Sequence, residues 1–436
     1  MFGTQLSFLP RFYRLSLVSV LSNMMVPLAG LVDTAFLGHL ADINQLAGVI
    51  LGSILFDYLY RILKFLRSST NALAAAAPDE ESALTVLLRS GVVALVVGLV
   101  LVLVQYPLRV VGFHLLTNVP ELQATGADYF DGRIWGAPAV LANFVLIGWF
   151  LGREQTSVVL AMSLLGNGIN VVLDYWWIPL WGSGGAGLAT AASQYGALGV
   201  GLVVALTTIG WHPQSLKSVF GAEAFRQTLA LKANLLIRFF LLISVYAVFT
   251  NLSARLGTAY LALNGILLQI ALLSQFTIQG VGLTTQTLVG NFHKEGEKAQ
   301  ILPLMKVSIL TSTAIALAIA LTTVAFPRLV FSLLTNHGDI QTGVLAYDWW
   351  LIPVLLLTAL AFMLEGYFIG IRAGEVLRNS CITSFLLFLP IAVLGWLYQN
   401  NDLLWGALTV YMAGLALALG WRFLQIHTVT PTGSTV

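Results

Sequence analysis

Long apolar runs divide the whole chain, and this feature limits its fold more than any other. Along 436 residues we find twelve segments of roughly 20 or more mostly apolar residues. Helices are expected for all of them, because lipid offers no partner for a backbone N–H or C=O group. Transmembrane strands would be shorter and would alternate in polarity. The segments are 13–37, 46–66, 84–106, 122–151, 157–181, 185–209, 234–256, 260–290, 303–333, 342–371, 379–398 and 403–424. The sequence therefore predicts an all-α, polytopic membrane protein with twelve transmembrane helices.

Composition supports this fold and excludes other classes of protein. Charged residues make up 9% of the chain, against about a quarter in a soluble domain. The net charge of +2, without a basic stripe, excludes a nucleic-acid partner. The single Cys381 excludes an internal disulfide and a cysteine-based metal cluster. Residues 182–187 match GxGxxG, but no strand precedes them, so we reject a dinucleotide site. We find no convergent nucleophile and base, and we predict neither an enzyme nor a resident cofactor or metal.

The distribution of positive charge predicts the orientation in the membrane. With the twelve spans above, fourteen Lys and Arg residues fall on the side of the two termini, and three Arg residues fall on the other. Cytoplasmic loops carry the excess of positive charge, so both termini are expected in the cytoplasm. The first apolar stretch has no separable signal peptide before it and is read as a retained span. We expect a multi-pass protein of the plasma (inner) membrane.

Similar motifs recur about half the chain length apart. The run Gly148–Gly152 returns as Gly366–Gly370, 218 residues later, and Tyr129 and Tyr347 have the same separation. Each half holds six spans, which predicts a parallel repeat of two pseudo-symmetric six-helix bundles. We expect an N-lobe over 1–210 and a C-lobe over 233–436. The cytoplasmic linker 211–232 fits an amphipathic helix and a plain loop equally well.

Two acids lie deep inside predicted spans, where ionisable groups are costly and mark functional sites. Asp33 lies in the first span and Asp174 in the fifth. Asn167, Asn170 and Asp174 follow at i, i+3 and i+7, which places them on one helix face. Desolvation disfavours the charged carboxylate, so these acids can exchange a proton, or bind Na⁺ together with Asn170. A hydrogen-bonded polar cluster that joins helices is the alternative.

Other residues in the spans are weaker candidates. Thr190 can offer a hydroxyl from the sixth span. Pro27 can bend the first span beside Asp33, and this bend serves either the coupled motion or helix packing alone. Asp57 and Arg61 are four residues apart and predict a local ion pair, while Arg238 is expected to reach toward water. Candidates for a cavity or substrate contact are Arg133, Trp135, Asn143, Gln279 and Glu365.

Several of these segments resemble one family. Residues 27–40 are similar to the first helix of the multidrug and toxic compound extrusion (MATE) family, in its DinF-type branch, and residues 65–70 to the end of its second helix. Residues 170–174, 185–190 and 366–370 resemble it too, so the likeness runs from about residue 13 to 424.

The resemblance implies a twelve-helix exporter with two lobes around a central cavity. Members expel lipophilic, often cationic compounds in exchange for H⁺ or Na⁺. Acids that match Asp33 and Asp174, with an amide that matches Asn170, are implicated in cation coupling, and a bend of the first helix in the coupled motion. The chain departs from the pattern at residues 71–79, which lack a glycine-rich turn, and at Gln279 and Gln286, where some relatives have acids. Glu365 is then the only obvious carboxylate of a C-lobe site.

The combined expectation is a secondary antiporter that exports small lipophilic or cationic compounds in exchange for H⁺ or Na⁺. We expect it to be a monomer that contacts membrane lipid and a small-molecule substrate. The alternative is a flippase of a lipid-linked or amphipathic substrate. That function needs a cationic cavity, for which Arg133 and Arg238 are the obvious candidates.

Overall fold

In a computed structural model of the chain, residues 7–37, 43–116, 119–209, 222–332 and 342–428 are described, and they form helices without any strand. Side chains are described for fewer of these residues, and those of 25–37 and 222–228 lie outside the description. The predicted all-α membrane fold is confirmed within these ranges.

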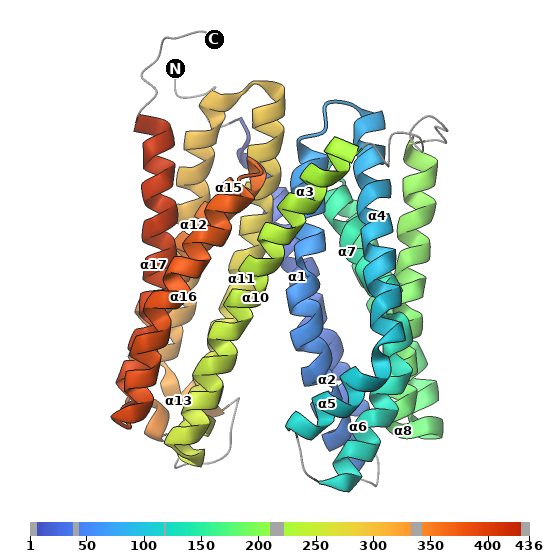
Figure 1. The fold of residues 1–436 in the computed structure, drawn as a ribbon, viewed down its shortest axis with the longest axis vertical. Coiled ribbons are helices and arrows are strands. Elements are labelled where there is room, and N and C mark those ends of the chain that lie inside the picture. Colours follow the sequence, from blue (N-terminus) through green and yellow to red (C-terminus); the bar gives the residue numbers. More distant parts are fainter. Residues whose placement is uncertain (1–6, 38–42, 117–118, 210–221, 333–341, 429–436) are drawn as a thin grey trace. The chain divides into compact units, whose positions relative to one another are not determined.

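The helices group into two compact units (Figure 1), which we call the N unit, Leu21–Lys232, and the C unit, Met1–Val20 with Ala233–Val436. The predicted N-lobe also included the first 20 residues, which the structure groups with the C unit. The boundary falls within the first helix, α1 (Leu9–Leu37). The other helices of the N unit are α2 (Ile43–Leu63), α3 (Phe65–Ala75), α4 (Glu80–Leu103), α5 (Gln105–Leu116), α6 (Pro120–Arg133), η1 (Ile134–Gly136), α7 (Ala137–Gly152) and α8 (Thr156–Ile209).

The C unit has the same kinds of elements. Its helices are α10 (Ala222–Leu256), α11 (Thr258–Glu295), η2 (Lys298–Gln300), α12 (Ile301–Ala325), α13 (Pro327–Ser332), η3 (Asp348–Trp350), α15 (Leu351–Gly370), α16 (Gly374–Leu397) and α17 (Asn401–Thr428). Residues 222–232 of the predicted linker are the start of α10 and run without a break into the seventh span. This part of the linker is therefore not a separate surface element, and 210–221 lie outside the described residues.

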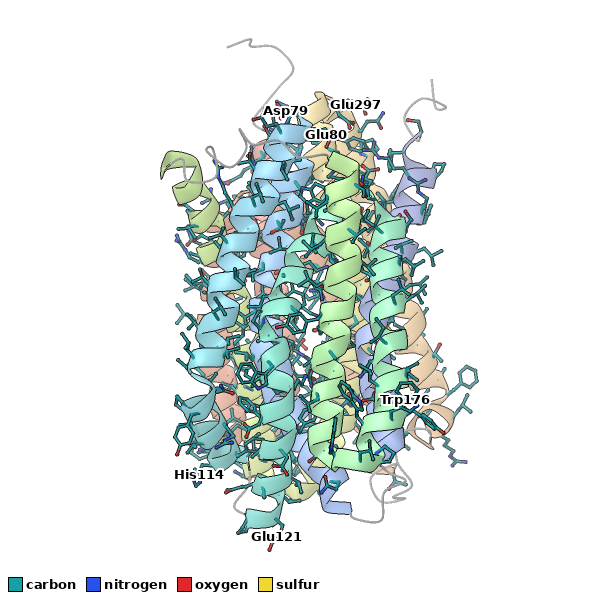
Figure 2. The ribbon with its side chains drawn as sticks, turned by 90° about the vertical axis from the view of Figure 1, so that its right-hand side faces the viewer. Asp79, Glu80, His114, Glu121, Trp176 and Glu297 are labelled. Carbon is teal, nitrogen blue, oxygen red and sulfur yellow. The ribbon has the colours of Figure 1, made fainter. Side chains whose placement is uncertain are left out.

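Nine segments of the described chain are long and apolar enough to cross a membrane. They contain ten of the predicted spans, because the segment Thr156–Thr208 holds both the fifth and the sixth. The first two predicted spans fall on α1 and on α2 with the start of α3. In the N unit, Asp79 and Glu80 lie at one end of the helices and His114 and Glu121 at the other (Figure 2), which places the charges where water is expected.

The bend inside α8 has a local cause. Gly182 has φ +56°, a conformation that favours glycine, and it reverses the chain between the two spans. The amide of Ser183 donates to Oε1 of Gln45 at 2.8 Å, which satisfies one free donor at the start of the second half of α8. Close approach then continues along the hairpin: a Cβ on Gly185 would lie 2.2 Å from the carbonyl oxygen of Trp177. The GxGxxG match thus describes a helical hairpin, as the absence of a preceding strand predicted.

Prolines interrupt the fourth and tenth spans. The 3₁₀ turn η1 directly precedes α7, whose second residue is Pro138, and η3 precedes α15, whose third residue is Pro353. A proline ring clashes with the carbonyl four residues earlier, so the α-helical ladder breaks just before it. The fourth and tenth spans are therefore kinked at these two positions.

The two units close the end of α7 and α15 in the same way. Glu154 and Arg372, 218 residues apart, have φ near +60°, which is uncommon for residues other than glycine. In both turns the amide of the following residue donates, at 2.8 Å, to the carbonyl five residues before it. The acceptor is Phe150 in the N unit and Phe368 in the C unit. The same turn at both positions agrees with the internal repeat.

The repeated glycines serve the same packing contact in each unit. α7 lies against α3 in the N unit, and α15 lies against α11 in the C unit. Each glycine touches a backbone carbonyl so closely that a Cβ could not fit without a shift. The distances from an added Cβ to the carbonyl oxygen are Gly148 to Arg67, 2.3 Å, Gly152 to Asn71, 2.7 Å, Gly366 to Gly282, 2.7 Å, and Gly370 to Gln286, 2.8 Å.

Candidate functional site

The acid of the fifth span is enclosed by protein. Asp174 lies in the first half of α8 and is 0% exposed. Asn170, one turn earlier on the same face, is also buried, and its Nδ2 makes no hydrogen bond in the described structure. A carboxylate removed from water gains stability when it is protonated or when a cation joins it, and an amide oxygen is a suitable second ligand for such a cation.

Two of the predicted coupling residues are engaged elsewhere. The amide of Asn167 donates to the Ser163 carbonyl at 2.6 Å, and the Thr190 hydroxyl donates to the Ala186 carbonyl at 2.9 Å. Both bonds lie within α8, one turn back along the same helix. In this structure the two side chains stabilise their own helix, so only Asn170 joins Asp174 as a described polar group on that face.

Asp33 and Pro27 lie in α1, and their side chains are outside the described residues. The side chains of α1 before residue 25 are described, about three turns from Asp33. The hydroxyls of Ser22 and Ser163 lie 2.9 Å apart, which ties α1 to α8. Asn23 Oδ1 accepts from Nη1 of Arg67 on α3 at 2.8 Å. The helix that carries Asp33 is therefore attached within the N unit to the helix that carries Asp174.

The cavity candidates of the N unit are held by intramolecular contacts. Arg133 donates to the Tyr129 hydroxyl and lies over the Phe56 ring, 4.8 Å from its centre. Asn143 on α7 donates to the carbonyl and side-chain oxygens of Gln194 on α8, at 2.9 and 3.1 Å. Trp135 is exposed, and its carbonyl accepts from the Tyr195 hydroxyl at 2.8 Å. Asn143 thus joins two helices, while Trp135 alone of the three presents a large free surface.

The C unit contains a buried ion pair that differs from the expectation for Arg238. Arg238 on α10 donates with Nε to Glu365 Oε1 at 2.9 Å and with Nη2 to Oε2. Both residues are at most 3% exposed. The two-point pairing satisfies the guanidinium inside the protein, so the side chain does not reach toward water. Gln279 on α11 is half-buried and is not part of this pair.

Two further ion pairs lie in the N unit, and one of them was predicted. Asp57 and Arg61 form the local pair expected from their spacing, at 3.9 Å. Asp131 pairs with Arg109, and Arg133 turns to the aromatic rings instead. The flippase alternative depended on Arg133 and Arg238, and both have partners inside their own unit.

The chain resembles one family over most of its length. The MatE family model matches residues 19–176 and again residues 235–394, one match in each half. The chain belongs to the MatE family.

Individual MATE relatives agree with this assignment. The chain is 30% identical to DNA damage-inducible protein F of Escherichia coli over 421 residues, which cover 94% of this chain and 91% of that protein. It is 23% identical over 339 residues to a probable multidrug resistance protein NorM of Thermotoga maritima, over 75% of this chain and 72% of that protein. The resemblance to the DinF-type branch is confirmed, and the protein is a member of a transporter family.

A solved MATE structure shares the fold. The outward-facing conformation of a multidrug resistance MATE family transporter of the MOP superfamily superposes with a TM-score of 0.85 and is 20% identical in sequence. The match covers 97% of this chain and 96% of the other. The predicted two-bundle architecture is thereby confirmed at the level of the fold.

Sequence reasoning missed two buried cations of this MATE protein. Arg67 is 8% exposed on α3, and Lys232 is 2% exposed, with Nζ 3.0 Å from the Ser69 hydroxyl and 3.2 Å from that of Ser90. Both had been counted among the cations on the cytoplasmic side. The motif 65–70 contains Arg67, but the sequence did not show that α3 continues to Ala75, about two turns beyond Arg67.

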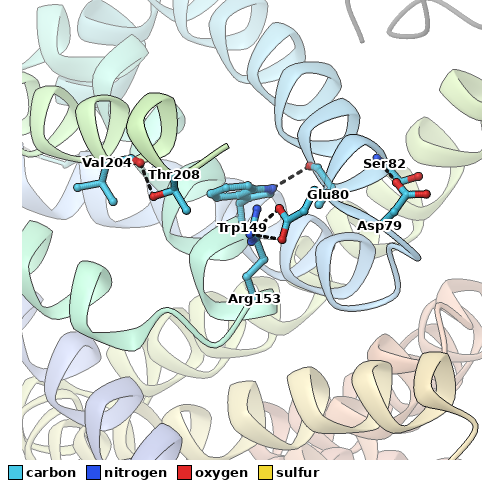
Figure 3. A network of polar contacts seen from close by, with 8 residues as sticks. Asp79, Glu80, Ser82, Trp149, Arg153, Val204 and Thr208 are labelled. Atoms are coloured by element: carbon cyan, nitrogen blue, oxygen red, sulfur yellow. Dashed lines mark hydrogen bonds and ion pairs between the residues drawn. The ribbon is translucent and has the colours of Figure 1, made fainter. Parts of the chain in front are cut away.

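Arg153, at the end of a helix, differs from Arg67 and Lys232 because its charge is paired with an acid (Figure 3). It follows α7, donates to Glu80 Oε1 at 2.6 Å, and lies 4.5 Å from the Trp149 ring centre. Trp149 Nε1 in turn donates to the Ala83 carbonyl at 2.8 Å. These contacts attach the end of α7 to the start of α4 and leave the Arg153 charge compensated.

Proposed function

We propose that this MATE protein is a secondary antiporter that exports small lipophilic or cationic compounds from the cytoplasm in exchange for H⁺, or for Na⁺. It lies in the inner membrane with both termini in the cytoplasm, acts as a monomer, and needs no cofactor besides the coupling ion. The observation that carries the proposal is the complete burial of Asp174 within a membrane-spanning helix. Ionisable residues in spans are functional by default because their burial is costly.

In the proposed cycle a proton from outside neutralises Asp174 or Asp33. The N unit then repacks around α1, with Pro27 as the bend, and releases substrate outward. Substrate from the cytoplasm favours the deprotonated state. Because both ligands act through the same carboxylates, their binding is mutually exclusive, and this exclusion couples the two fluxes.

The available driving force is sufficient. One pH unit supplies about 1.4 kcal/mol, which supports about a tenfold concentration gradient of a monovalent cation exchanged one for one with a proton. A neutral substrate would also gain about 2.3 kcal/mol from each 100 mV of membrane potential.

Transport in proteoliposomes tests the proposal. We would measure accumulation of ethidium, a fluorescent lipophilic cation, into vesicles with an acidic lumen. Asp174→Asn and Asp33→Asn should each reduce the accumulation to the level without a pH gradient. Asp57→Asn is the matched control, because Asp57 is a partly exposed acid of the same unit paired with Arg61. Normal transport by both Asn variants refutes the proposal, and the same assay with an imposed Na⁺ gradient identifies the ion.

A further inference from the structure

Arg67 is a buried cation whose protein contacts leave most of its donors unused. Its Nη1 donates to Asn23 Oδ1 at 2.8 Å. Its Nε and Nη2 are buried and make no hydrogen bond in the described structure. An arginine keeps its proton in proteins, so burial cannot be relieved by neutralisation of the side chain.

The geometry of the unused donors is specific. Nε and one terminal nitrogen form one edge of the guanidinium plane, and that edge matches the two oxygens of a carboxylate or phosphate. Arg238 in the C unit uses the corresponding edge, Nε with Nη2, to hold the carboxylate of Glu365. The Glu365 carboxylate thus shows, within the same protein, the kind of group that fits the Nε–Nη2 edge of an arginine.

A second donor lies beside it on the same helix. Thr70 follows Arg67 by three residues on α3, so the two share a helix face. Thr70 is fully buried, and its hydroxyl makes no hydrogen bond in the described part of the chain. Lys232 contacts Ser69, which projects from the opposite face of α3, so it does not compete for this position. Buried donors without acceptors are rare in native proteins and call for a ligand.

We propose that Arg67, with Thr70 and with Asn23 as the residue that positions the guanidinium, binds an anionic group, a carboxylate or a phosphate. The group belongs to a transported compound or to a lipid headgroup. If the group belongs to a transported compound, that compound carries an acid group, alone or beside a cationic one. Water can satisfy the hydrogen bonds of this edge, but only an anion also compensates its charge.

Equilibrium binding without any ion gradient tests the inference separately from the antiport proposal. The protein would be held in phosphatidylcholine nanodiscs and titrated with radiolabelled benzoate, with benzyl alcohol and benzylammonium as neutral and cationic probes of similar shape. We expect saturable binding of benzoate only. Arg67→Gln should weaken it at least tenfold, and Arg67→Lys should be intermediate, because lysine keeps the charge and loses the planar edge. Thr70→Val should weaken it a few-fold.

Arg153→Gln is the matched control, since it removes the same charge from the same unit at a site already paired with Glu80. A second arm detects a lipid occupant: native mass spectrometry would count phospholipids retained by wild type and by Arg67→Gln. A phospholipid retained by wild type and lost in the variant, without benzoate binding, assigns the anion to a headgroup. Benzoate binding that is equal in Arg67→Gln, or the absence of both benzoate binding and an Arg67-dependent lipid, overturns the inference.

Discussion

The two units bury an arginine each, and they treat it differently. In the C unit, Arg238 faces the carboxylate of Glu365 through two hydrogen bonds. In the N unit, Arg67 has one bond to a neutral amide and two nitrogens without a hydrogen bond. A buried pair whose charges compensate each other, such as Arg238 with Glu365, is suited to a structural role. A unit that leaves a buried cation open, and also encloses Asp174, is suited to bind ligands and ions.

Neutral buried polar groups also differ in how they are satisfied. In the C unit the Asn264 side chain bonds Ser253 at 2.7 Å, Asn401 at 2.7 Å and Trp405 at 2.9 Å, so α10, α11 and α17 are joined by a closed network. In the N unit the Thr70 hydroxyl makes no hydrogen bond in the described structure, and in the C unit the same is true of Ser274. The Thr70 hydroxyl differs in that it lies one turn from the unused donors of Arg67.

Removal of the acid from the C-unit pair should have the largest effect on stability. Glu365→Gln leaves Arg238 buried without a countercharge, and we expect a loss of about 3–5 kcal/mol in the free energy of unfolding. Denaturant unfolding in detergent measures it. The double variant Arg238→Met/Glu365→Leu is the control, because replacement of both charges by apolar groups should recover most of the loss. An undisturbed single variant would contradict the scaffold role of the pair.

Asn264→Ala should have the next largest effect. It leaves the Trp405 indole and the Asn401 amide without their partner in a buried site, and we expect a cost of about 2–3 kcal/mol. The same unfolding assay applies. Thr70→Val in the N unit is the counterpart, and it should change stability little, since no hydrogen bond is lost. Equal effects of the two substitutions would remove the contrast between the units.

Arg67→Met should raise the stability of the protein, whereas Glu365→Gln and Asn264→Ala should lower it. Without an anion, wild type carries the full desolvation cost of an uncompensated guanidinium, so the variant should be more stable by about 1 kcal/mol. Added benzoate should raise the unfolding midpoint of wild type and leave that of the variant unchanged. Destabilisation by several kcal/mol would show that Arg67 is as fully compensated as Arg238.

The smallest expected effect on stability concerns the N-terminal ends of α4 and α12, two helices at corresponding positions in the two units. Asp79 accepts from the Ser82 amide at 2.7 Å and caps α4, whereas α12 has no side-chain cap. This hydrogen bond holds the pKa of Asp79 below its usual value. The cap therefore stabilises above the unfolded-state pKa, near about 4, and its effect is lost as pH falls through the lower folded-state value.

Asp79→Ala should accordingly lower the unfolding midpoint slightly at neutral pH. The difference from wild type should vanish in strongly acidic solution, as a thermal melt at several pH values would show. Gln300→Ala at α12 is the control without a cap bond, and it should show no such pH dependence. A constant difference for Asp79→Ala across the pH range would rule out the charged cap.

The fold was predictable because it follows from hydrophobic length, and this signal is strong in each span. The repeat was predictable because glycines at 148, 152, 366 and 370 are required by close contact with a neighbouring backbone. Asp174 was found because an acid in an apolar run is conspicuous. Arg238 was misjudged because its partner Glu365 is 127 residues away, a pairing that no local pattern encodes. Arg67 was missed because an arginine near a helix end looks like a surface charge until the helix is seen to continue.

The central claim is that the N unit carries ion coupling and the C-unit pair is structural. The most direct test compares pH-driven ethidium accumulation by Asp174→Asn with that by Arg238→Met/Glu365→Leu, in the same proteoliposome preparation. The account predicts that Asp174→Asn folds and loses accumulation, while the double variant accumulates ethidium close to the wild-type level. Accumulation retained in Asp174→Asn and lost in the double variant would contradict it.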